Sequence, residues 1–166
     1  MEIPSCRGIG EKEMAQNISK SNRLDLFSKI KSAILNSAIL QRKFKDENFY
    51  EFEPPFHSLT FKHLPYIVIN IPSTDTKDDV QVFDHNIVGK DYEFTIMLVM
   101  DYEARDNFKA YAQEIMKNIE AKESDFELDG FYDLEIDLIR SPVELLDKRK
   151  VISGEFKLTF NGSVNR

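Results

Sequence analysis

Alternating apolar and polar positions near the end of the chain form its clearest pattern. In residues 131–138 the apolar set is Tyr132, Leu134, Ile136 and Leu138, and the polar set is Asp133, Glu135 and Asp137. In residues 151–160 the apolar set is Ile152, Phe156, Leu158 and Phe160, and the polar set is Ser153, Glu155, Lys157 and Thr159. Successive side chains of a β-strand point to opposite faces. The pattern therefore predicts two strands with one buried face each, and a row of acids on the solvent face of the first.

Apolar positions spaced by three and four residues predict two helices. The first helix starts at Ser21 or Asn22 and fades near Arg42. Its apolar stripe is Leu24, Phe27, Ile30, Ile34 and Ala38. The second helix covers 104–122, with the stripe Ala104, Phe108, Tyr111, Ala112, Ile115 and Ile119.

Two more strands lie between these helices. Residues 66–71 form a short segment rich in β-branched side chains, which predicts a strand. Residues 92–101 predict a second strand, which is apolar on both faces. A further short strand is possible at residues 80–83. The order α-β-β-α-β-β predicts one α+β domain over residues 21–166, in which helices cover one face of a mostly antiparallel sheet in two layers. Residues 1–20 are polar and are expected to form a flexible N-terminal arm. Residues 141–150 are expected to form a long hairpin connection with room for a short helical turn.

Residues 43–64 are irregular and rich in aromatic side chains: Phe44, Phe49, Tyr50, Phe52, Phe56 and Phe61. Pro54 and Pro55 exclude a regular helix or a central strand there. So many aromatic rings are expected to pack, either over the edge of the domain's own core or against a partner.

Composition narrows the function classes. The chain of 166 residues has 22 basic and 29 acidic residues, a formal net charge of −7, which opposes binding to nucleic-acid phosphates. No apolar run approaches the about 20 residues of a membrane helix. Cys6 is the only cysteine, so an internal disulfide is impossible.

Three groups of side chains are candidates for metal binding or catalysis. Asp75, Asp78, Asp79, Asp84 and His85 offer oxygen ligands for a cation, but they lack the EF-hand spacing. His57, His63 and His85 lack zinc-site spacing. Glu155 and Lys157, with Asp133 or Asp137 on the neighbouring strand, resemble the carboxylate–lysine set of a metal-dependent nuclease, although the acidic charge disfavours such a substrate. No phosphate loop or nucleophile elbow occurs, and this absence favours a binding or structural role over an enzyme.

In size, in the order of their predicted elements and in their overall sequence pattern, residues 23–161 resemble the tail terminator (tail completion) proteins of long-tailed bacteriophages. The features that carry this resemblance are the long first helix, the segment Leu64–Ile69, the strand 92–100 that leads directly into the helix 104–122, and the two closing strands. The resemblance implies a structural virion protein, assembled in the host cytoplasm, that caps the tail tube as a ring and joins it to the head. It also implies no enzymatic activity, no metal and no cofactor.

The same resemblance implies partners and candidate residues. The partners are further copies of the chain in a hexamer, the tail tube protein and a head-completion protein, while DNA passes through without specific binding and no membrane is involved. Asp133, Glu135 and Asp137 would face the lumen and repel DNA, or else form an ordinary solvated sheet face. Phe49, Tyr50, Phe52 and Phe56 would contact the neighbouring subunit. The alternative reading is a small α+β module that binds a partner or ligand, and a metal-dependent nuclease comes third.

Overall fold

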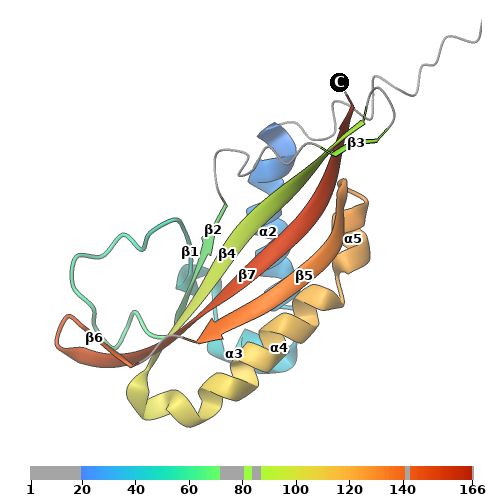
Figure 1. Ribbon diagram of the computed structural model, residues 1–166. Helices are drawn as coiled ribbons and strands as arrows, with labels where there is room; N and C mark the ends of the chain where they lie inside the picture. Colours follow the sequence, from blue (N-terminus) through green and yellow to red (C-terminus); the bar gives the residue numbers. More distant parts are fainter. Residues whose placement is uncertain (1–19, 72–80, 84–86, 141–142, 166) are drawn as a thin grey trace, which may run out of the picture.

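The computed structural model describes residues 20–71, 81–83, 87–140 and 143–165, and these form a sheet with helices on one face (Figure 1). The helices are α2 (Lys20–Ile34), α3 (Ala38–Lys43), α4 (Phe108–Glu120) and α5 (Glu123–Glu127), with 3-10 turns η1 (Asp46–Asn48) and η2 (Tyr102–Asn107). The strands are β1 (Phe49–Glu51), β2 (Tyr66–Asn70), β3 (Gln81–Phe83), β4 (Ile87–Asp101), β5 (Phe131–Arg140), β6 (Glu144–Leu146) and β7 (Arg149–Asn165).

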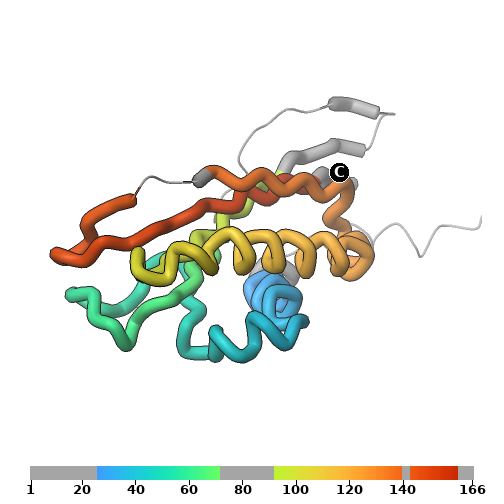
Figure 2. Tube along the Cα trace, turned by 90° about the horizontal axis from the view of Figure 1, so that it is seen from below, coloured from blue at the N-terminus to red at the C-terminus, as the bar shows by residue number. Residues whose placement is uncertain are grey.

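The described strands form one sheet with the order β1-β2-β4-β7-β5. Only β1 and β2 are parallel, and every other pair is antiparallel. The short strands β3 and β6 extend the sheet as hairpin partners of β4 and β7. The predicted α+β class, with helices on one face of a mostly antiparallel sheet, is confirmed (Figure 2).

The core lies between the sheet and the helices. Alternate residues of β7 face it, and Phe156, Leu158 and Phe160 are fully buried. The helices contribute buried side chains to the same core: Ile30 and Ile34 from α2, and Ile115 and Ile119 from α4. The expected alternation is therefore confirmed for residues 155–160, whereas Ser153, predicted on the solvent face, is buried at 6% exposure.

The first predicted helix is interrupted, and the structure gives the reason. α2 ends at Ile34, and α3 starts after Ser37. The Ser37 hydroxyl accepts a hydrogen bond from the Leu40 backbone at 3.4 Å, which caps a new helix. The Gln41 side chain donates to the Leu35 carbonyl at 2.7 Å and binds one acceptor at the break. Residues 144–146 likewise form strand β6 rather than a helical turn.

Asn118 joins the two long helices from a buried position. Its side-chain amide donates to the carbonyl of Ile34, the last residue of α2, at 3.1 Å. Helices leave their last carbonyls without partners inside the helix. The amide of Asn118 therefore supplies the hydrogen-bond donor that the Ile34 carbonyl cannot find within α2.

Asn118→Ala is expected to lower the free energy of unfolding by about 1–3 kcal/mol, because a buried acceptor loses its donor. Urea denaturation measures the change. Gln113→Ala, at an exposed position of the same helix, is the control and is expected to stay within about 0.5 kcal/mol. Equal losses in the two variants would contradict the proposed contribution of this hydrogen bond.

Candidate functional site

The face of the sheet opposite the helices is the first candidate surface. Figure 2 shows α2 and α4 on the same side of the sheet, and none of the described helices covers the middle of the other face. The register places Glu135 beside Thr159 and Asp137 beside Lys157. On β4 and β7 the same face includes Glu93 and Glu155, because each of them is offset by one position from a buried core residue. We call this surface the open face.

A bulge changes the predicted acidic row. The pairing of β5 with β7 shifts between Tyr132 and Glu135, and Asp133 has a φ of 52°. The extra residue reverses the phase of the strand, so Tyr132 turns toward the open face, where it is 44% exposed. The prediction that Tyr132 belongs to the apolar set is wrong. Glu135 and Asp137 keep their predicted face, while Asp133 sits in the bulge and not in a continuous row with them.

Charge on the open face is mostly negative. In the middle of this face Lys157 is the one basic side chain among the described residues, against Glu93, Glu135, Asp137 and Glu155. The Lys157 ammonium lies 2.9 Å from the Glu93 carboxylate. The hydrogen bond and the charge of Glu93 raise the pKa of Lys157 above its usual range, and Asp137 adds to the effect. A single lysine thus offsets only part of the acidic charge.

The nuclease-like set falls on this same open face. Asp137 pairs with Lys157 across the strands, and Glu155 pairs with Ile139. Among the residues that the structure describes, no group of three His, Cys, Asp or Glu side chains is placed to hold a metal ion. The cation candidates at Asp75, Asp78, Asp79, Asp84 and His85 lie outside the described residues.

The aromatic segment packs largely within its own chain. Phe49 is buried in the main core, beside Phe44 at a ring distance of 6.3 Å. Tyr50 and Phe56 pack with Tyr66 in a second, smaller cluster that covers one end of the open face. Among the four predicted interface residues, Phe52 keeps a largely exposed ring, at 53%.

Tyr66 marks the inside of this second cluster. Burial raises the pKa of its phenol, and the nearby Tyr50 adds to the effect. His63 stacks on Phe56 with ring centres 4.0 Å apart, and its Nδ1 accepts the backbone N–H of Thr60 at 3.0 Å. These contacts give the proline-containing loop a defined path over the sheet.

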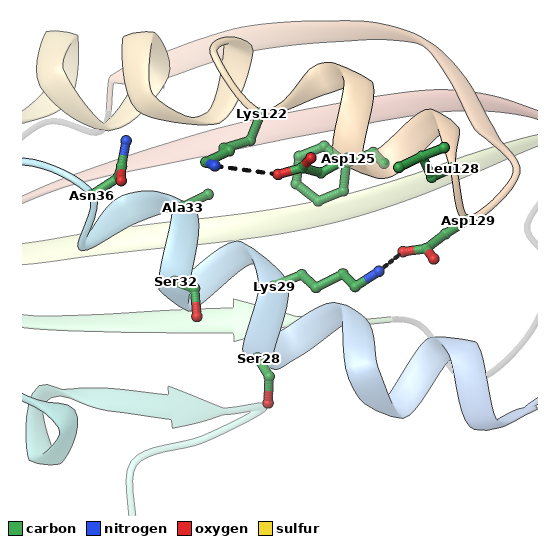
Figure 3. A pocket seen from close by; sticks show the side chains of 10 residues that line it. Ser28, Lys29, Ser32, Ala33, Asn36, Lys122, Asp125, Leu128 and Asp129 are labelled. Atoms are coloured by element: carbon green, nitrogen blue, oxygen red, sulfur yellow. Dashed lines mark hydrogen bonds and ion pairs between the residues drawn. The ribbon is translucent and has the colours of Figure 1, made fainter.

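A groove between α2 and α5 is a second candidate site, with a volume of roughly 590 Å³ (Figure 3). Lys29 of α2 forms an ion pair with Asp129, and Lys122 forms one with Asp125 at 3.3 Å. Leu128 stands at the groove with 85% of its surface exposed. The groove presents paired charges beside one exposed apolar side chain, Leu128, and two buried ones, Ala33 and Phe126.

Sequence reasoning did not find this groove. One signal was present, because Leu128 belongs to no apolar stripe and stands among Glu123, Asp125, Glu127 and Asp129. What the sequence lacked was the position of α5 against α2, which depends on packing between segments about 100 residues apart.

Comparisons with known proteins do not assign the chain to a family. A scan against protein-family models and a search of curated proteins each found no match to the chain. Within the described residues, no helix is both long and apolar enough to cross a membrane.

Proposed function

We propose that this chain is a structural assembly protein of a long-tailed phage or prophage, which caps the tail tube as a ring and joins it to the head. The single observation that carries the proposal is the open face: helices cover one side of the sheet, and the middle of the other side is acidic and carries no helix from the described residues. The α+β class, with helices on one face of a mostly antiparallel sheet, is consistent with the same proposal. The role requires no catalysis and no cofactor.

The open face would line the lumen of the ring. DNA phosphates passing the carboxylates of Glu135, Asp137 and Glu155 would be repelled, so DNA would move without adhering to the wall. Lys157 is engaged by Glu93 and offers little attraction to phosphate. The partners are further copies of the chain, expected as a hexamer, together with the tail tube protein and a head-completion protein. The assembled product would be located in the virion.

Charge reversal on the open face tests this role. Glu135→Lys combined with Asp137→Lys is expected to leave folding and assembly intact, because both side chains are exposed, yet to reduce DNA passage and infectivity. Thermal unfolding and electron microscopy check the first part, and plaque counts check the second. Full infectivity of this variant would rule out the lumen assignment.

The matched control changes the same charge elsewhere. Glu47→Lys with Glu114→Lys reverses two acids that lie outside the open face. This control is expected to keep wild-type infectivity. Equal loss in both variants would attribute the effect to net charge and not to the lumen.

A small module that binds a partner or ligand is the alternative function, and the groove between α2 and α5 is the observation that favours it. Light scattering after size-exclusion chromatography separates the two, followed by electron microscopy with isolated tail tubes. A ring at the tube end supports the tail protein. A chain that stays monomeric at high concentration and leaves tubes bare supports the binding module.

A further inference from the structure

Two exposed surfaces of opposite charge lie at opposite ends of the molecule. The first is the β6–β7 hairpin, residues 143–150, which projects beyond the end of β5 in Figure 1. The second is the region of α5, residues 120–129, which Figure 2 shows at the other end of the sheet. We call them the hairpin end and the α5 end.

The hairpin end combines apolar side chains with a small excess of basic charge, from Lys148, Arg149 and Lys150 against Glu144 and Asp147. Leu145 is 66% exposed and Val143 is 47% exposed. Lys148 and Lys150 are exposed, and neither has an ion-pair partner among the described residues. This tip therefore offers apolar surface beside two unpaired cations.

The hairpin is also held in one conformation. Asp147 and Lys148 have φ values of 48° and 64°, a region that is unfavourable for residues other than glycine. The Asp147 carboxylate accepts the backbone N–H of Leu59 at 2.8 Å, and the Arg149 guanidinium lies 3.2 Å from the ring centre of Phe61. A tip fixed in this way loses little conformational freedom on binding.

The α5 end carries the complementary chemistry. Leu128 is exposed at the mouth of the groove. Glu123 and Glu127 are the first and last residues of α5, and neither has an ion-pair partner within the described part of the chain. The lysines of the groove, by contrast, are already paired with Asp125 and Asp129.

We infer that the hairpin end of one copy docks against the α5 end of the next copy. Leu145 packs near Leu128 at the α2–α5 groove, and Lys148 and Lys150 lie near Glu123 and Glu127. Because the two surfaces differ, the contact is heterologous and generates a closed ring when its rotation closes. This inference rests on the proposed ring function, and it leaves the open face free to line the lumen.

Charge reversal at both ends tests the contact with purified full-length chains. One variant carries Glu123→Lys and Glu127→Lys, and the other carries Lys148→Glu and Lys150→Glu. Each alone places like charges across the contact and is expected to weaken self-association about tenfold or more. Mixing the two restores opposite charges at every contact, so the mixture is expected to recover wild-type assembly. A single chain with all four changes is expected to recover it as well.

Native mass spectrometry and light scattering read the result, and circular dichroism checks that each variant is folded. Wild-type assembly of both separate variants would overturn the contact while leaving the ring intact, and so would weakened variants that do not rescue each other. A wild-type chain that is monomeric even on tail tubes would overturn the ring and the contact together.

An uncharged variant gives an independent measurement. Leu128→Ser removes a side chain that contributes little to the fold, so stability is expected to stay unchanged while self-association falls. Ile39→Ser, at a position that is 54% exposed and outside both ends, is the control. Equal association of the two variants would count against the contact.

Discussion

Phe160→Ala is expected to lower the free energy of unfolding by about 3–5 kcal/mol. The side chain is fully buried on β7. Its ring centre lies 5.4 Å from that of Phe126, 5.6 Å from Phe131 and 5.7 Å from Phe94. Truncation opens a cavity among three rings that cannot all collapse into it. It also removes the contacts that the Phe160 ring makes with each of them.

Chemical denaturation measures this loss, and the adjacent residue supplies the control. Thr159 lies on the open face, so Thr159→Ala is expected to change stability by no more than about 0.5 kcal/mol. Because domains of this kind are stable by about 5–15 kcal/mol, Phe160→Ala should also lower the expression of folded protein. A loss below about 1 kcal/mol would mean that the aromatic cluster does not hold the sheet to α5.

The fold class was predictable because the large helices and strands show the helical or alternating spacing of apolar residues in the sequence. β7 alternates in burial from Gly154 to Phe160, and α4 keeps the predicted stripe that includes Phe108, Ile115 and Ile119. The break after Ile34 was not predicted, because the apolar stripe continues through it at Ala38. Only the local hydrogen bonds of Ser37 and Gln41 reveal that a second helix begins.

The candidate sites were harder to predict from the sequence than the fold class. A bulge at Asp133 inserts one residue, and strict alternation cannot represent such an insertion. Phe49 lies in a segment without periodicity, so its burial in the main core depended on parallel pairing between β1 and β2, which is not a local property. The hairpin end and the α5 end became visible only when the fold placed them at opposite ends of one molecule.

Gly154→Ala is expected to destabilise the protein by about 1–3 kcal/mol, although it adds only one methyl group. Gly154 is buried on β7, opposite the start of α4. A Cβ at this position would lie 2.6 Å from Cζ of Phe108 and 3.4 Å from a methyl carbon of Leu138. The Phe108 ring is itself 2% exposed, so it has little room to move away. The missing side chain therefore permits the close approach of α4 to the sheet.

A double-mutant cycle with Phe108→Leu isolates this contact, because leucine is shorter than the phenylalanine ring at the point of collision. Each single change is expected to destabilise, but the double variant should be more stable than the sum of the two losses predicts, by about 0.5–3 kcal/mol. Denaturant titrations of the four proteins give the coupling energy. Simple additivity, within about 0.3 kcal/mol, would show that Gly154 is required for a reason other than its approach to Phe108. Positive coupling would identify the Gly154–Phe108 contact as the point that sets the distance between α4 and the sheet.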